Sequence, residues 1–394
     1  MHLSHDIHLA YCTNIHRGES WAETLKALQR YTLAVRDQVS PGKPYAIGLR
    51  LSDLASRELS EPGTLATFRD WLDAENCYVF TINGFPYGQF HGVRVKEQVY
   101  HPDWTRPERL EYTRRLFDIL AQLVPAGIEG SVSTVPVSFK EFIYEEAQIR
   151  EAQQNLWRCV DYISELSDRS GVKLHLGLEP EPLCYLETTT ETARFFDQLR
   201  AARPGDSRLD QCLGVNYDCC HLAVEYEQPA EAIGRLMKAG IKISKIHLSS
   251  ALSLRPTSEA RAALAAFAED VYFHQVLARQ SSGGITRHRD LNLALAAPVQ
   301  PTEEEWRIHF HVPLHCQPNP LFGTTADHLL GVLDLVQRNP KMCAHFEMET
   351  YTWEVMPPGM KDRNVVDQLV AEYRWTLDEF GRRGIRLHSN HSTP

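Results

Sequence analysis

The sequence lacks the motifs that identify several common enzyme classes. It contains no G-x-G-x-x-G, no G-x-x-x-x-G-K-[ST] and no G-x-S-x-G, so dinucleotide-binding, P-loop and serine-hydrolase functions have no motif support. It has no apolar run of the ~18 to 20 residues that a membrane-spanning helix needs. Its nine cysteines include no C-x-x-C pair, and its N-terminus has no basic stretch followed by an apolar one. These absences predict a soluble cytoplasmic protein without structural disulfides.

The charge balance disfavours a nucleic-acid partner. The chain has 41 Lys and Arg against 51 Asp and Glu, a formal net charge of −10 at pH 7. Binding to a phosphate backbone needs the opposite sign or a basic patch, and the sequence pattern shows no such patch. With 394 residues, 43% apolar and 23% charged, the chain is long enough for one large α/β domain. We therefore predict a small-molecule partner, and the sequence leaves the oligomeric state open.

Short β-rich runs alternate with amphipathic helical runs along the chain. The β-rich runs are residues 9–15, 45–52, 77–83, 130–137, 174–181, 212–218, 243–248, 307–314 and 342–349. The clearest helical runs are residues 20–39, 106–124, 142–169 and 365–380, which place apolar residues at three- and four-residue spacing. This alternation predicts a mostly parallel sheet. Because no glycine-rich turn follows the first strand, a (β/α)8 TIM barrel is favoured over a doubly wound sheet.

The alternation is interrupted between residues 250 and 300. There a helical run is followed by VYFHQVLARQSSGGITRHRDL, which predicts a β-hairpin that turns at Ser282-Gly283-Gly284. Nine β-rich runs are one too many for the barrel, and periodicity does not decide whether residues 307–314 are a barrel strand. We assign them to the insertion. The prediction is a single TIM-barrel domain over residues 1–394 with an insertion at approximately 250–315.

Residue types that bind metals end four of the later β-rich runs. They are Glu179 and Glu181, Asp218 and His221, His247, and Glu347 and Glu349. In a TIM barrel the C-terminal ends of the strands form the active face. Alternation along a strand puts both members of each glutamate pair on one face, and confined carboxylates need a cation or another partner. A set of two glutamates, one aspartate and one histidine is rich in oxygen and has one imidazole nitrogen. It predicts one divalent ion, Mn²⁺, Mg²⁺ or Co²⁺, with Zn²⁺ as a further candidate.

Two further segments are candidates for the same face. His309 and His311 in RIHFHVPLH are in phase with each other, and we interpret them as core or insertion contacts that are alternative or supporting site residues. The loop of residues 83–91 contains Asn-Gly and Phe-Pro turn signals. We expect it to lie over the active face, with Phe85 and Tyr87 as an apolar wall and Asn83 and Phe85 in contact with substrate.

The order Glu, Asp-x-x-His, His, Glu resembles that of the xylose-isomerase-like barrels, which include D-tagatose 3-epimerase and the endonuclease IV group. Residues 181–187, EPLCYLE, match the spacing of the epimerase segment E-P-L-N-R-F-E but lack its asparagine and arginine. Glu349-Thr350-Tyr351 matches the family's final glutamate. The resemblance implies that Glu181, Asp218, His247 and Glu349 are the metal ligands, with Glu179 and Glu347 as alternatives. It also implies that His221 and Glu187 contact the substrate.

Several longer segments resemble the metabolite traffic proteins of ebo operons, the EboE family. These segments are YCTNIHRGESW, NGFPYGQFHG, LEPEPLCYLET, HFHVPL and ETYTWEVMP. The resemblance implies a part in moving or maturing a metabolite precursor, and it defines no reaction.

Three functions agree with these features. The first is a metal-dependent sugar isomerase or epimerase acting on a small polyhydroxylated or α-hydroxycarbonyl compound, with Glu181 and Glu349 as the base and the acid. The second is an endonuclease-IV-like phosphoesterase that cleaves a small phosphate ester. The third is a metabolite-binding protein that keeps the barrel and the metal without turnover.

Overall fold

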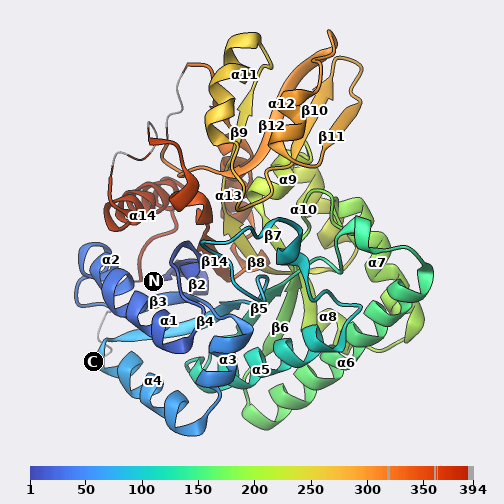
Figure 1. Ribbon diagram of the computed structural model, residues 1–394. Coiled ribbons are helices and arrows are strands. Elements are labelled where there is room, and N and C mark those ends of the chain that lie inside the picture. The colour runs from blue at the N-terminus through green and yellow to red at the C-terminus, as the bar shows by residue number, and fades with distance from the viewer. Residues whose placement is uncertain (317–319, 359–360, 362, 389–394) are drawn as a thin grey trace.

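Parallel strands form a barrel at the centre of the computed structural model, which describes residues 1–316, 320–358, 361 and 363–388 (Figure 1). The strands are β2 (Ile7–Tyr11), β3 (Tyr45–Arg50), β4 (Cys77–Asn83), β5 (Gly130–Thr134), β6 (Leu174–Leu178), β7 (Leu213–Asp218), β8 (Lys242–Leu248) and β14 (His345–Met348). They neighbour one another in the order β2-β14-β8-β7-β6-β5-β4-β3, and a bridge between Cys12 and Gly48 joins the two ends. The predicted barrel is confirmed. A short strand, β1 (His2–Leu3), pairs antiparallel with β2.

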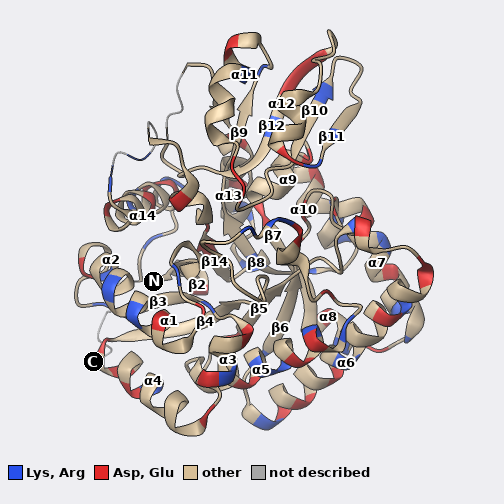
Figure 2. Ribbon diagram, in the orientation of Figure 1, with Lys and Arg blue, Asp and Glu red and all other residues tan. Residues whose placement is uncertain are grey.

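Helices surround the barrel. They are α1 (Trp21–Ala27), α2 (Leu33–Val39), α3 (Asp53–Leu59), α4 (Pro62–Ala74), α5 (Pro107–Leu123), α6 (Glu146–Ser170), α7 (Thr189–Ala202), α8 (Arg208–Cys212), α9 (Cys219–Val224), α10 (Pro229–Lys238), α13 (Ala326–Arg338) and α14 (Val365–Arg382). Local sequence fixes their starts, as in α7, where Thr188 and Glu191 form a capping box. Acidic and basic residues are interspersed along α6 and α7, as on solvent-facing helices (Figure 2). Within the described ranges, no helix is both long and apolar enough to cross a bilayer.

Polar side chains fill much of the inside of the barrel, where branched apolar residues are usual. Lys245 on β8 is fully buried, forms an ion pair with Glu347 on β14, and donates a 3.1 Å hydrogen bond to Ser133 on β5. A Cβ atom at Gly48 would lie 2.0 Å from Oε1 of Glu347, so only glycine leaves room for this carboxylate. A buried polar layer therefore supports the C-terminal mouth of the barrel from below.

A second, antiparallel sheet is formed by the part of the chain that separates β8 from β14 in sequence. Its strands, in spatial order, are β11 (Ile285–His288), β10 (Val276–Gln280), β12 (Glu303–His311), β9 (Ala251–Leu254) and β13 (Gly323–Thr324). With α11 (Ser258–Leu264) and α12 (Leu291–Ala296), it projects from one end of the barrel (Figure 1). The predicted hairpin is confirmed, and Gly283 in its turn has a φ of 85°. Most of residues 307–314 belong to β12, so they extend the inserted sheet and not the barrel.

Candidate metal centre

Four buried side chains meet where the later barrel strands end. Glu179 follows β6, Asp218 ends β7, His247 lies near the end of β8, and Glu349 follows β14. One oxygen or nitrogen atom of each lies within 4.8 Å of the corresponding atom of every other. Their relative exposures are 2%, 0%, 0% and 4%. Three carboxylates and one imidazole therefore share a small volume from which bulk water is excluded.

The His247 ring faces carboxylates on both sides. Its Nδ1 atom lies 3.0 Å from Glu179 Oε1, 3.1 Å from Glu349 Oε2 and 3.4 Å from Asp218 Oδ2. Its Nε2 atom lies 3.2 Å from Glu347 Oε2. In a neutral ring Nε2 donates to Glu347, which leaves the Nδ1 lone pair directed at three further carboxylates. That arrangement is favourable only when a proton or a metal ion lies between Nδ1 and the carboxylate oxygens.

The charge of this cluster fits a divalent ion. Burial alone would lower the pKa of His247, but Glu349 and Glu179 outweigh burial and raise that pKa well above its usual value. Among the described residues, Glu179 Oε2 and Asp218 Oδ2 have no hydrogen-bond partner although both atoms are buried. Leaving carboxylate oxygens buried and unpaired is costly. An oxygen-preferring divalent cation would satisfy these oxygens and the histidine nitrogen together.

Other side chains hold the cluster in place. Asp218 Oδ1 accepts hydrogen bonds from Ser249 Oγ at 2.7 Å and from the His221 backbone nitrogen at 2.9 Å. Glu349 Oε1 accepts from Asn14 Nδ2 at 2.7 Å and from Asn83 Nδ2 at 3.3 Å. The other oxygen of each carboxylate, Asp218 Oδ2 or Glu349 Oε2, therefore remains available to the cluster.

Glu181 lies outside the cluster, and Glu179 occupies the place that the family resemblance gave to Glu181. Strand alternation ends at Leu178, where β6 stops, and the chain then turns through Pro180 and Pro182. Glu181 Oε1 accepts a 2.6 Å hydrogen bond from Tyr100 and lies 3.6 Å from His309 Nδ1. Burial raises the pKa of Glu181 to about 7.

Glu347 and Glu349 have different surroundings although both point into the barrel. Glu349 belongs to the four-residue cluster. Glu347 lies one layer deeper, against Lys245 and His247 Nε2. A carboxylate that accepts from the distant nitrogen of a metal-binding histidine fixes its ring orientation and tautomer. Glu347 is thus placed to orient His247.

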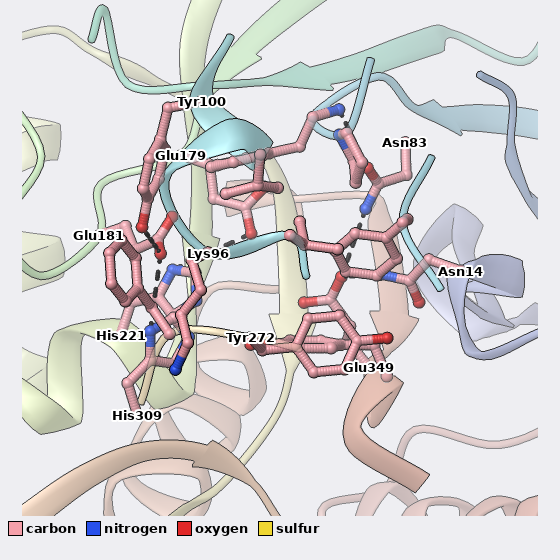
Figure 3. A pocket seen from close by; sticks show the side chains of 17 residues that line it. Asn14, Asn83, Lys96, Tyr100, Glu179, Glu181, His221, Tyr272, His309 and Glu349 are labelled. Atoms are coloured by element: carbon pink, nitrogen blue, oxygen red, sulfur yellow. Dashed lines mark hydrogen bonds and ion pairs between the residues drawn. The ribbon is translucent and has the colours of Figure 1, made fainter. Parts of the chain in front are cut away.

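A narrow cavity lies above the cluster. Figure 3 shows Tyr100, Glu181 and His309 on one side of it and Asn14, Asn83 and Glu349 on the other. Its volume is about 60 Å³. A single water needs at least ~10 to 15 Å³, so this space admits several waters or a small ligand. Its aromatic wall consists of Phe85, Phe90, Tyr100, Tyr272, Phe273 and Tyr351.

The remaining predicted residues divide between the cavity and its surroundings. His221, His309, Asn83 and Phe85 line the cavity. His311 is buried beside it, with its ring centroid 5.5 Å from that of His221. Tyr87 packs against Tyr112 with ring centroids 5.0 Å apart, outside the cavity lining. Glu187 forms ion pairs with Lys140 at 2.8 Å and with Arg287 at 3.0 Å, also away from the lining.

Several cavity residues were not predicted from the sequence. Asn14 and Tyr100 hold the two carboxylates on opposite sides of the cavity, and Tyr272 covers it from the insertion. They lie outside the barrel strands, so strand-end reasoning does not find them. Asn14 does fall within YCTNIHRGESW, a segment that supported a family resemblance.

Solved structures of other proteins share this fold. A xylose isomerase-like TIM barrel protein from Mycobacterium smegmatis in complex with magnesium has a TM-score of 0.52 at 12% identity, covering 97% of this chain and 99% of that one. The IOLI protein with a zinc atom has a TM-score of 0.51 at 12% identity, covering 96% and 99%. L-ribulose 3-epimerase has a TM-score of 0.50 at 12% identity, covering 98% and 96%. The chain therefore has a xylose-isomerase-like TIM-barrel fold.

No protein-family model matches the sequence, and no curated protein matches it either.

Proposed function

We propose that this protein is a metal-dependent isomerase or epimerase that acts on a small polyhydroxylated or α-hydroxycarbonyl metabolite. One observation carries the proposal: His247 Nδ1 faces three buried carboxylates at the C-terminal end of the barrel. Glu179, Asp218, His247 and Glu349 would hold one divalent ion there, with Mn²⁺, Mg²⁺ or Co²⁺ favoured by the oxygen-rich set and Zn²⁺ as the further candidate. When bound, such an ion polarises a carbonyl and stabilises the charge that forms as an α-proton leaves.

Two carboxylates are placed to move that proton. Glu181 is outside the cluster, carries the Tyr100 hydrogen bond and faces the cavity from the side opposite Glu349 (Figure 3). Epimerisation requires a proton to leave one face of a carbon and return to the other, which two opposed carboxylates can do. His221 also lines the cavity and is placed to hold a substrate oxygen.

The walls of the cavity restrict what binds. The aromatic side chains exclude water, which strengthens the electrostatic interactions inside. The inserted sheet contributes His309, which supports treating the barrel and insertion as one functional domain. The cavity volume supports a small-molecule ligand. The resemblance to the EboE family further suggests a substrate in the traffic of a metabolite precursor.

A metal-dependent phosphoesterase acting on a small phosphate ester is the second candidate. It is favoured by the three histidines His221, His309 and His311, whose rings lie within 5.5 Å of one another beside the carboxylates. Lys96 also lines the cavity, but its amino group pairs with Asp290 at 2.5 Å and is not directed at a ligand phosphate.

Proton exchange separates these candidates. The metal-loaded protein is incubated in heavy water with sugars, sugar phosphates and cyclitols that raise its melting temperature, and deuterium at the α-carbon is measured by NMR. The proposal predicts exchange in the wild type, and loss of exchange in Glu181→Gln at an unchanged metal content. Phosphate release without exchange would favour the phosphoesterase. If the protein shows neither proton exchange nor phosphate release with any ligand that raises its melting temperature, that result would indicate a binding protein.

A further inference from the structure

A second and larger pocket, which we call the outer pocket, lies beside the cavity. It is lined by side chains of α1 and of the π-helical segment η3 (Leu28–Thr32), by residues 15–19, by Gln89, His91 and Gly92, and by Trp353, Glu354, Lys361 and Val365. Its volume is about 600 Å³, within the range of small-molecule sites. We propose that the outer pocket binds a separate small molecule through a phosphate group, which Lys26 and Arg30 hold.

Lys26 and Arg30 are exposed cations on one side of the outer pocket. They are four positions apart in a continuous helical segment, and like charges at this spacing repel and destabilise a helix. Arg30 lies in the π-helical segment, a type of irregularity that is frequent at functional sites. The Arg30 guanidinium is 5.0 Å from the centroid of the Tyr31 ring. An anion bound by both side chains would relieve their repulsion.

The carboxylates of the outer pocket are engaged elsewhere. Glu354 forms an ion pair with Arg17 at 2.8 Å, and Glu19 forms one with Arg50 at 3.2 Å. Glu23 Oε2 accepts hydrogen bonds from two backbone nitrogen atoms before the start of α1, at 2.9 and 3.1 Å. Over the residues that the structure describes, none of these three carboxylates forms an ion pair with Lys26 or Arg30. Their charges are therefore available to a ligand.

The local charge favours an anion although the whole chain has a formal net charge of −10. Lys361 adds a third cation to the outer pocket, where its Nζ atom donates to the backbone oxygen of Glu354 at 3.3 Å. A phosphate monoester carries about −1.5 to −2 charge at pH 7 and offers three acceptor oxygens. Arginine binds such oxygens through parallel N–H groups, and lysine binds them as a point charge. These residue types therefore match a phosphate group.

Hydrogen-bonded side chains separate the outer pocket from the cavity. His91 lines the outer pocket, and its Nε2 atom donates to the backbone oxygen of Asn14 at 2.6 Å. Its Nδ1 atom therefore accepts a 2.6 Å hydrogen bond from the Tyr272 hydroxyl. Asn14 and Tyr272 both line the cavity. Because this wall lies between the two spaces, the phosphate ligand is a molecule other than the isomerase substrate, and the outer pocket does not depend on the proposed function.

Titration calorimetry with inorganic pyrophosphate tests the proposal. The full chain is stripped of metal and then freed of chelator, so that pyrophosphate has no bound cation to coordinate. We expect saturable binding of one pyrophosphate per chain, and at least about 10-fold weaker binding in the double variant Lys26→Gln/Arg30→Gln. The matched control is Arg194→Gln/Lys238→Gln, which removes the same number of exposed cations outside the outer pocket. It should bind like the wild type.

Four results would overturn the proposal. The first is the absence of saturable binding to the wild type, and the second is undiminished binding to Lys26→Gln/Arg30→Gln. The third is an equal loss in both double variants, which would show an effect of net charge alone. The fourth is binding that His309→Ala abolishes, because His309 lines the cavity and not the outer pocket. The four cations replaced in the double variants are exposed, and circular dichroism verifies that each variant is folded before titration.

Discussion

Lys245→Met is expected to destabilise the protein more than any surface substitution. Lys245 and Glu347 form an ion pair with side-chain exposures of 1% and 0%. Burial alone would raise the pKa of Glu347, and Lys245 with His247 lowers it below its usual value, so the carboxylate is charged in the folded state. Methionine is unbranched like lysine and one atom shorter, and it leaves this charge buried without its main partner. Breaking one side of a buried pair costs about 3 to 5 kcal/mol.

Urea unfolding of Lys245→Met, Glu347→Gln and the double variant measures this effect. The double variant should recover part of the loss, because replacing both members of a buried pair removes the uncompensated charge. Metal affinity adds an independent readout, since Glu347 orients His247, and removing such a contact costs about 10- to 100-fold. A loss of less than ~1 kcal/mol in Lys245→Met, the range of an exposed pair, would refute the reasoning.

Three further predictions concern single residues. Gly48→Ala places a Cβ 2.0 Å from Glu347 Oε1, so we expect about 1 to 3 kcal/mol of destabilisation and weaker metal binding. Urea unfolding measures the stability and calorimetry measures the metal affinity. Unchanged values for both would contradict the close approach. Burial raises the pKa of Glu372 to about 7 from its ordinary 4.5. The folded state therefore holds this proton more tightly, and stability falls as pH rises between these values, by about 2 to 3 kcal/mol. Glu372→Gln should gain about that much relative to the wild type between pH 5 and pH 8, and parallel stability curves would count against it. Tyr100→Phe removes the 2.6 Å hydrogen bond to Glu181 and should slow proton exchange with little change in metal content, whereas Tyr87→Phe, outside the cavity lining, should leave exchange unaltered.

Sequence patterns predicted the barrel because its strands and helices have distinct periodicities. The runs that become β6, β7, β8 and β14 end in charged or imidazole side chains, so strand-end reasoning alone found the residues of the cluster. The choice between Glu179 and Glu181 was beyond that reasoning. Alternation orders side chains only while the strand continues, and β6 stops at Leu178.

Long-range contacts explain the remaining differences. Glu187 was expected to contact the substrate, but it lies away from the cavity lining and pairs at 3.0 Å with Arg287 of the inserted sheet, 100 positions along the chain. The hairpin of the insertion has a local turn signal at Gly283, whereas β9 and β13 are short and acquire their pairing only from the folded sheet. Asn14 acts on Glu349 across 335 positions, and no local pattern contains that contact.

Anomalous diffraction from crystals of the protein loaded with Mn²⁺ tests the central claim most directly. The account predicts a peak about 2.0 to 2.6 Å from ligand atoms of Glu179, Asp218, His247 and Glu349, with the Glu181 carboxylate outside the coordination sphere. A peak coordinated by Glu181 in place of Glu179, or no peak among these four residues at saturating Mn²⁺, would contradict it.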